Sequence, residues 1–220
     1  MTLARFITDF ADQAVILPLA LAVGLCHWAA GWRRGCAAWG GVVCATLALV
    51  LALKIGFGLH GPASESGLLL RSPSGHTAAA GVVYGGLLAI LIRRVGGRVG
   101  WAVLCAAAAA ALVGATRSSL GAHSAPEILL GGAVGVAGAA VLAGVMRDPP
   151  SGLRAPLAAV ALAVVLAFHG LHLPAEAYIR HAISGSLRPG ESGEHAGPGG
   201  SGRPADARAD AVDDAGRPPG

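Results

Sequence analysis

Six apolar segments, each close to the length of a membrane-spanning helix, constrain the fold of this chain more than any other feature. They cover residues 14–32, 37–58, 76–92, 99–115, 124–146 and 153–173. A helix needs about 20 apolar residues to cross roughly 30 Å of hydrocarbon. The mean hydropathy of +0.63 is also too high for an ordinary soluble domain. Because a backbone in lipid must satisfy its hydrogen bonds internally, we expect an all-α bundle of about six transmembrane helices.

The six segments define one membrane domain, residues 14–175, with a polar segment on either side. Residues 1–13 place Leu3, Phe6, Ile7 and Phe10 at helical spacing, with Arg5, Asp9 and Asp12 on the other face. This pattern predicts a short helix lying in the membrane interface, with a frayed terminus as the alternative. Residues 184–220 are rich in Gly, Pro, Ser and Asp and lack apolar periodicity. We therefore expect a disordered tail there.

The charge and cysteine content argue against two classes of function. The formal net charge is only +4 and the arginines are spread over the loops, which does not fit nucleic-acid binding. The four cysteines have no Cys-x-x-Cys spacing, so we expect free thiols and no metal site. They are Cys26, Cys36, Cys44 and Cys105.

Arginines in three short loops predict the orientation in the membrane. They are Arg33 and Arg34 after the first segment, Arg93, Arg94 and Arg98 after the third, and Arg147 and Arg154 after the fifth. The positive-inside rule places these loops in the cytoplasm and both termini outside. We expect a protein of a cell membrane, such as a bacterial inner membrane. Its other loops would then lie on the periplasmic or extracellular side.

Two cations lie at the predicted outer ends of apolar segments. Lys54, the single lysine of the chain, is near the end of the second segment, and Arg117 follows the fourth. Charge beside a membrane span is costly, so such residues are functional candidates. Both suit phosphate binding, and snorkelling of the side chains to lipid headgroups is the alternative.

The run Pro73-Ser74-Gly75-His76 precedes the third segment. Ser74 is a suitable N-cap, and the free amides of a helix start, at the positive end of its dipole, attract anions. His76 would stand at the rim of this anion site. A plain helix cap with a bystander histidine is the alternative.

His123 and Glu127 have the i, i+4 spacing that places both on one face of a helix start. The carboxylate can accept a hydrogen bond from one ring nitrogen and fix the tautomer of the histidine. The other ring nitrogen is then suited to act as a nucleophile or base. A purely structural hydrogen bond is the alternative.

The order of these motifs resembles that of the type 2 phosphatidic acid phosphatase family, which includes lipid phosphate phosphatases and vanadium-dependent haloperoxidases. The family signatures read Lys-x6-Arg-Pro, Pro-Ser-Gly-His and Ser-Arg-x5-His-x3-Asp. This chain reads Lys54-x6-Gly61-Pro62, Pro73-Ser74-Gly75-His76 and Thr116-Arg117-x5-His123-x3-Glu127. Thr116 keeps the hydroxyl and Glu127 keeps the carboxylate, but Gly61 stands where the family has arginine. His60 or Arg71 is a candidate substitute for that arginine.

The resemblance, over about residues 50–145, implies an integral membrane phosphatase that needs no metal or other cofactor. Its substrate would be a lipid phosphate or a polyprenyl diphosphate, such as undecaprenyl diphosphate, bound at the outer face. His123 would attack phosphorus and form a phosphohistidine, Glu127 would orient its ring, and His76 would protonate the leaving oxygen. The phosphoryl oxygens would be bound by Lys54, Ser74, Gly75 and Arg117. Phosphoryl transfer to a lipid acceptor is an alternative to hydrolysis.

Other classes of function fit less well. Gly61 is compatible with a catalytically silent family member that binds lipid headgroups. A transporter is disfavoured because the ionisable residues gather at one face and no inverted repeat is visible. A metalloprotease would need His-Glu-x-x-His, which is absent from the sequence. A serine protease using Ser74 and His123 is disfavoured by their proline, glycine and arginine neighbours.

Gly131 and Gly135 form a small-xxx-small pair in the segment 124–146. Small residues at this spacing let two helices approach closely in a membrane. We expect the partner helix to belong to the same chain, with a homo-oligomer contact as the alternative.

Overall fold

The computed structural model describes residues 2–60, 72–92 and 98–172, which lie within one compact unit, Met1–Leu187. In these residues the chain forms helices and no strand, which confirms the all-α prediction. The helices are α1 (Leu3–Asp9), α2 (Gln13–Ala29), α3 (Arg33–His60), α4 (Gly75–Leu91), α5 (Arg98–Ser119), α6 (Ala125–Val145) and α7 (Arg154–Phe168). The boundaries of α2 to α7 lie within five residues of the predicted segments. The expected tail, Gly61, Arg71, Arg93 and Arg94 lie outside the described residues.

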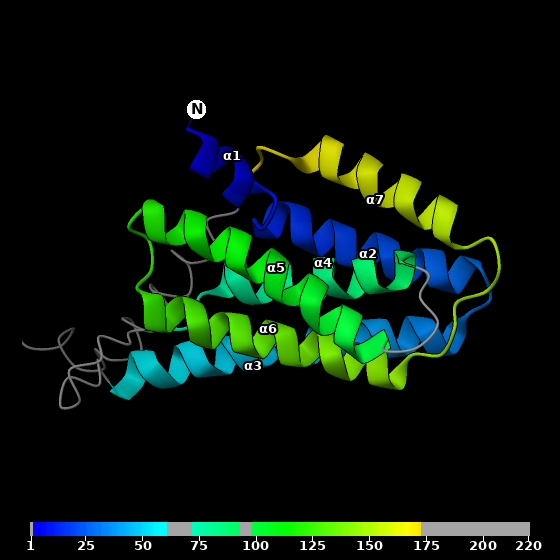
Figure 1. Cartoon of the computed structure of the whole chain (residues 1–220), viewed down its shortest axis with the longest axis horizontal. Coiled ribbons are helices and arrows are strands. Elements are labelled where there is room, and N and C mark those ends of the chain that lie inside the picture. The colour runs from blue at the N-terminus through cyan, green and yellow to red at the C-terminus, as the bar shows by residue number, and fades with distance from the viewer. Residues whose placement is uncertain (1, 61–71, 93–97, 173–220) are drawn as a thin grey trace, which may run out of the picture. The chain divides into compact units, whose positions relative to one another are not determined.

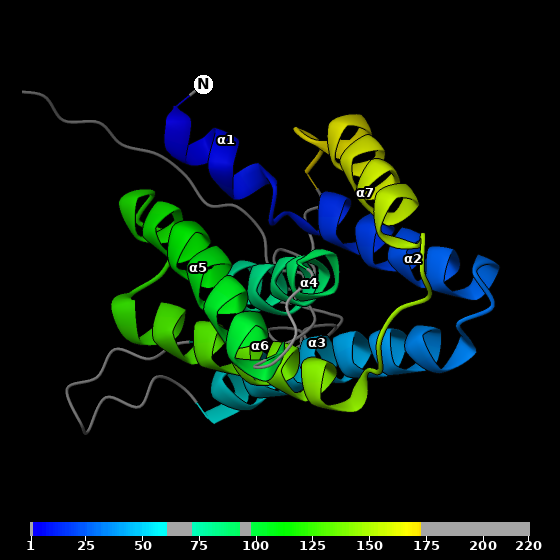
Figure 2. The ribbon, with the colours of Figure 1, turned by 45° about the vertical axis from the view of Figure 1, so that its right-hand side comes forward.

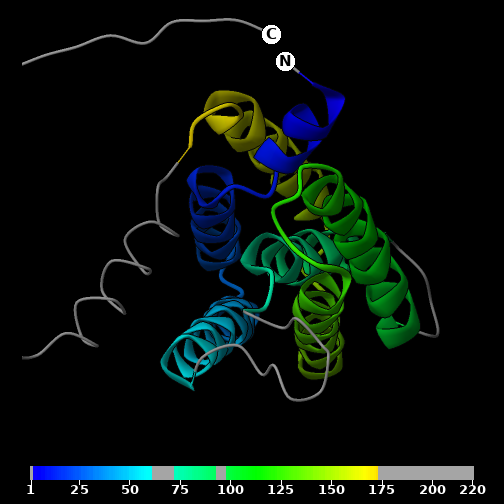
Figure 3. The same cartoon turned by 90° about the vertical axis from the view of Figure 1, so that its left-hand side faces the viewer.

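Four helical stretches are long and apolar enough to cross a membrane, which indicates a membrane protein. They are Leu3–Ala29, Arg33–Leu59, Arg98–Ser119 and Ala125–Val145. The two remaining apolar helices, α4 and α7, are shorter. α4 lies in the centre of the bundle, with α2, α3, α5 and α6 around it (Figures 2 and 3). Its neighbours enclose it so completely that 11 of its 17 residues are buried.

Glycines and alanines bring α4 into close contact with α5 and α6. A Cβ atom added at Gly85 would meet the backbone of Ala106 on α5. A Cβ at Gly131 would overlap the carbonyl oxygen of Ser74, and one at Gly135 would overlap that of Ala78. The predicted small-xxx-small pair of α6 therefore packs against α4 within the chain. This contact fixes the start of α4 against the start of α6.

The N-terminal segment forms α1 and then turns into α2. Asp9 and Asp12, which the helical pattern places on a polar face, are instead buried, with 2% and 7% of their surfaces exposed. The physical reason is that the chain turns between α1 and α2, so both carboxylates face the protein. The hydroxyl of Tyr84 on α4 donates to the carbonyl of Phe10 at 2.6 Å, which ties this turn to the bundle centre. The interfacial position of α1 stays a prediction.

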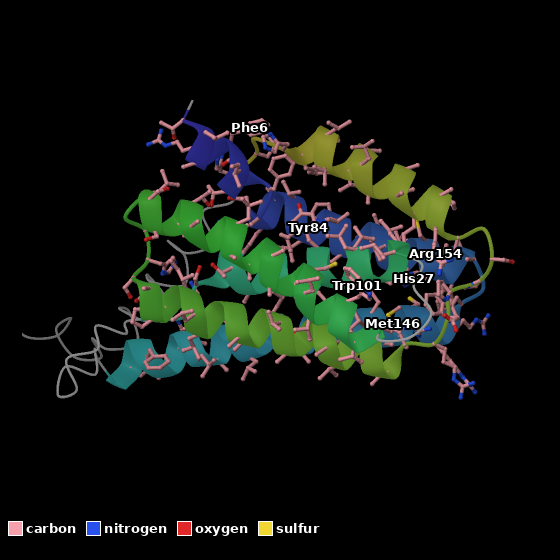
Figure 4. All side chains as sticks on the ribbon, viewed as in Figure 1. Phe6, His27, Tyr84, Trp101, Met146 and Arg154 are labelled. Atoms are coloured by element: carbon pink, nitrogen blue, oxygen red, sulfur yellow. The ribbon has the colours of Figure 1, made fainter. Side chains whose placement is uncertain are left out.

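The helices run lengthwise, so that the bundle has two distinct ends (Figure 1). One end, the arginine end, holds the starts of α3, α5 and α7 with Arg33, Arg98 and Arg154. Arg98 donates to the carbonyl of Met146 at 2.8 Å, and Arg154 donates to that of Ile90 at 3.0 Å. In Figure 4, Met146 and Arg154 lie at this end. The opposite end, the site end, holds the end of α3, the starts of α4 and α6 and the end of α5.

Candidate functional site

The predicted site residues that the structure describes all lie at the site end of the bundle. Lys54 lies in the last two turns of α3, and Ser74 to His76 form the start of α4. Arg117 lies in the last turn of α5, and Glu127 lies in the first turn of α6. Figure 3 views the bundle from this end. The topology therefore brings to one end residues as far apart in the sequence as Lys54 and Glu127.

Glu127 connects two of the three motifs. Its Oε2 lies 3.1 Å from Nδ1 of His123 and accepts from the backbone N–H of Ser124 at 3.0 Å. Its Oε1 accepts from the backbone N–H of Ser72 at 3.0 Å. Its backbone carbonyl accepts from the N–H of Ser74, also at 3.0 Å. One buried residue thus caps α6, holds the histidine and binds the segment that leads into α4.

The contact with Glu127 orients the ring of His123. An ionised carboxylate can only accept hydrogen bonds, so the contact with Glu127 places a proton on Nδ1 of the neutral ring. Nε2 then carries the lone pair, and this nitrogen is the one suited to act as a nucleophile or base. Only 7% of the His123 side chain is exposed. The imidazole is therefore held by packing as well as by the carboxylate.

Ser74 is the N-cap of α4, as predicted. Its hydroxyl oxygen accepts from the N–H of Thr77 at 3.5 Å and lies 2.8 Å from the hydroxyl oxygen of Thr77. The residue is fully buried, because Gly131 of α6 packs directly on its backbone. The first amides of a helix have no intrahelical acceptor, and the helix dipole makes this end positive. The start of α4 can therefore bind an anion.

Lys54 lies over the start of α4. Its Cε and Nζ are 3.5 and 3.7 Å from the position that a Cβ of Gly75 would occupy. Glycine thus leaves the room that lets the ammonium group reach the helix start. The charge of Lys54 and the positive end of the α4 dipole therefore lie close together, beside the amide of Gly75. This combination suits a bound phosphate.

A cavity of about 230 Å³ adjoins this point, and we call it the α2–α4 cavity. Gln13, Lys54, Gly75 and His76 form its polar part. Its remaining lining residues are Ala11, Ile16, Leu17, Leu47, Val50, Leu51 and Ala79. The cavity therefore joins a cationic helix start to a mainly apolar wall.

The turn between α5 and α6 sets the separation of Arg117 and His123. Gly121 adopts a φ of +64°, which favours glycine, and the N–H of Ala122 donates to the carbonyl of Arg117 at 3.0 Å. Thr116, which replaces the family serine, donates its hydroxyl to the carbonyl of Val113 at 2.7 Å. Its hydroxyl therefore stabilises the end of α5.

Sequence reasoning missed one residue near the site. Asp12 lies at the start of α2, and its Oδ2 is 3.9 Å from Nε2 of His76. Its role as a helix cap has a sequence signal, since aspartate is a preferred N-cap. Its approach to His76 has none, because 64 residues separate the two.

The structure describes the side chain of neither candidate substitute for the missing arginine. Arg71 lies outside the described residues, and His60 is the last residue of α3.

Within the described ranges, no group of three or more His, Cys, Asp and Glu side chains is arranged to hold a metal ion.

Comparison with known proteins agrees with this arrangement. The model of the PAP2 superfamily matches residues 37–149, a span that contains most of α3 and all of α4, α5 and α6. Searches of curated proteins and of solved structures gave no match. The family match covers just over half of the chain and includes all three motifs, which confirms the resemblance to type 2 phosphatidic acid phosphatases. This chain therefore belongs to the PAP2 superfamily, and that membership supports phosphatase activity on phosphate esters.

Proposed function

We propose that this protein hydrolyses a lipid phosphate or a polyprenyl diphosphate through a phosphohistidine intermediate on His123. The observation that carries the proposal is the double role of Glu127. Its carboxylate holds Nδ1 of His123 while it binds the backbone of Ser72, directly before the anion-binding start of α4. The candidate nucleophile and the candidate phosphate site are therefore held by the same side chain.

The first chemical step transfers the phosphoryl group to the protein. Nε2 of His123 attacks phosphorus, a P–N bond forms, and the bond from phosphorus to the leaving oxygen breaks. His76 gives a proton to that oxygen, which leaves as an alcohol or a lipid phosphate. Glu127 accepts from Nδ1–H throughout and stabilises the positive charge that develops on the ring.

The second step returns the protein to its starting state. Water attacks the phosphohistidine, His76 takes a proton from that water, and the P–N bond breaks to release inorganic phosphate. His123 leaves as a neutral imidazole with its proton still on Nδ1. His76 is again charged and ready for the next substrate.

Fixed positive groups stabilise the phosphoryl oxygens in both steps. Lys54 lies over Gly75 at the start of α4, and Arg117 projects from the end of α5. With the Gly75 amide and the Ser74 hydroxyl, they offset negative charge that grows in the transition state. The planar guanidinium of Arg117 suits two oxygens of one phosphoryl group.

Two observations support a lipid substrate at the outer face of the membrane. The site lies at one end of a bundle in which four helical stretches are long enough to span a membrane. The α2–α4 cavity places apolar side chains beside Lys54 and His76, where a lipid chain would accompany its phosphate. Since the arginine end is cytoplasmic by the positive-inside rule, the site end would face the periplasm or the extracellular space.

Phosphate release from purified protein in detergent with EDTA tests the proposal. Wild type should release phosphate from at least one member of a panel of lipid monophosphates and polyprenyl diphosphates. His123→Ala should release none, and His172→Ala, which removes a 61% exposed imidazole outside the site, should match wild type. Equal release by wild type and His123→Ala would overturn the mechanism.

The same assay separates the competing functions. No release from any substrate, combined with retained binding of lipid phosphates, would favour a silent family member that binds headgroups. Loss of substrate without phosphate release, seen only when a lipid alcohol is added, would favour phosphoryl transfer.

A further inference from the structure

We propose that Asp12 is a positioning residue for His76, holding the imidazole so that one ring nitrogen faces the leaving oxygen of the substrate. The inference rests on the proposed function, since it assigns Asp12 a role in that reaction. It adds α2 to the helices that build the site, although the three family motifs lie on α3 to α6 and the segments that join them.

The first observation is the contact itself. Oδ2 of Asp12 lies 3.9 Å from Nε2 of His76, and the two side chains are only 10% and 14% exposed. The distance is longer than a hydrogen bond, so the contact is an electrostatic one between a carboxylate and the ring when it is charged. Lys54 from α3 also borders the cavity that His76 lines. The carboxylate therefore offsets a cation that would otherwise disfavour a second positive charge.

The second observation is that Asp12 is fixed in place. Its Oδ1 accepts from the N–H of Ala14 at 2.8 Å, so one oxygen caps α2 while the other faces His76. The neighbouring Ala11 packs with Ala80 of α4, and the backbone carbonyl of Phe10 accepts a hydrogen bond from the hydroxyl of Tyr84. Two contacts thus hold residues 10 and 11 against α4, the helix that carries His76. The carboxylate and the imidazole are positioned by the same helix packing.

The third observation is the location of Asp12 beside the candidate site. Ala11 and Gln13, on either side of it in the chain, line the α2–α4 cavity together with Lys54, Gly75 and His76. The start of α2 therefore forms one wall of the space that adjoins the phosphate site.

The chemistry follows from the two nitrogens of the ring. A charged imidazole carries a proton on each nitrogen. Nε2–H faces Asp12, so Nδ1–H is the proton that passes to the leaving oxygen. The neutral ring keeps its Nε2 proton and exposes a lone pair on Nδ1, which then accepts a proton from the attacking water. Asp12 thus favours the tautomer that both steps need, through a longer contact than the hydrogen bond between Glu127 and His123.

Asp12→Asn tests this role, because asparagine caps helices as well as aspartate does but carries no charge. Two substrates should be compared: an alkyl lipid phosphate, whose leaving oxygen needs a proton, and p-nitrophenyl phosphate, whose leaving group departs as an anion. For Asp12→Asn we expect kcat/KM on the alkyl ester to fall about tenfold or more, since general acids contribute roughly 100- to 10,000-fold. On p-nitrophenyl phosphate kcat/KM, which reports only the transfer of the phosphoryl group to His123, should stay within about twofold, since that step needs little help from a general acid.

Two further variants complete the experiment. Asp9→Asn is the matched control, because Asp9 is a buried carboxylate that contacts His172 instead of His76. It should leave the ratio of the two kcat/KM values at the wild-type level. Asp12→Glu keeps the charge and should recover part of the alkyl-ester activity.

The outcomes separate this inference from the proposed function. An equal fall of both kcat/KM values in Asp12→Asn would show a structural role only, and no fall in either would show no role. Either result overturns the inference while leaving the phosphatase proposal intact. If wild type hydrolyses neither substrate nor any lipid phosphate, the proposed function fails and the inference fails with it.

Discussion

At the scale of single residues, the site depends on side chains that each have two partners. Glu127 binds both His123 and the segment before α4, and Asp12 both caps α2 and faces His76. A change at such a residue alters orientation and charge together. Conservative substitutions are therefore the informative ones, because they keep the shape and remove one property.

Replacing Glu127 by glutamine tests the orientation of His123. The amide can donate to Nδ1, which would place the proton on Nε2 and remove the attacking lone pair. We expect kcat to fall about 100-fold or more, with a small change in KM. Glu127→Asp restores the family residue and keeps the carboxylate, so it should retain most of the activity. Full activity of Glu127→Gln in a steady-state assay would contradict the assigned role.

Restoring the family arginine at position 61 tests the departure in the first motif. A charge-assisted contact contributes about 1.5–3 kcal/mol, so Gly61→Arg should raise kcat/KM roughly ten- to hundredfold if the position lacks a cation. The measurement is phosphate release under conditions where substrate is limiting. An unchanged kcat/KM would show that another residue, for which His60 and Arg71 are the candidates, already fills the place.

At the scale of helices, the start of α4 is positioned by the small residues that face it. The backbone of Ser74 rests on Gly131, and that of Ala78 rests on Gly135 one turn later. Larger side chains at these two positions would separate α4 from α6. The hydrogen bonds from Ser72 and Ser74 to Glu127 are only 3.0 Å long and depend on that close approach.

Gly131→Ala tests this packing. Its Cβ would overlap the carbonyl oxygen of Ser74, so α4 must shift. Overpacking of this kind costs about 1–3 kcal/mol, or a melting temperature lower by roughly 2–12 °C. We expect lower kcat as well, because the shift moves the phosphate site. The matched control is Gly144→Ala, where no described atom lies within 4 Å of the new Cβ. Equal melting temperatures for both variants would refute the argument.

At the scale of the whole molecule, the bundle separates its charges between two ends. At the arginine end, Arg98 and Arg154 donate hydrogen bonds to backbone carbonyls. The motif residues lie at the opposite end of the bundle. This separation lets a lipid substrate meet the site from one side of the membrane. It also makes the orientation testable without any knowledge of the substrate.

Cysteine labelling in intact cells tests the orientation. In a variant without native cysteines, Ala122→Cys lies at the site end and Arg34→Cys at the arginine end, and both positions are exposed. A membrane-impermeant maleimide should label only Ala122→Cys in intact cells and both variants after lysis. Labelling of Arg34→Cys alone in intact cells would reverse the proposed orientation.

The sequence predicted the helices and part of the site because both depend on local spacing. Apolar length identifies the segments that become α2 to α7, since burying a backbone in lipid requires helices. The i, i+4 spacing alone places His123 beside Glu127, and the N-cap preference alone explains Ser74. The helical pattern of residues 1–13 did not reveal that Asp9 and Asp12 are buried, because their burial depends on how the turn between α1 and α2 packs against the bundle.

What only the tertiary structure decided are the contacts between distant segments. The hydrogen bond from Ser72 to Glu127, the position of Lys54 over Gly75 and the approach of Asp12 to His76 join different helices. Spacing along a chain reports which residues share a helix face, but the distance between two helices depends on the volume of every side chain between them. Here that distance is set by glycines of α6 against the backbone of α4, and so is the geometry of the site.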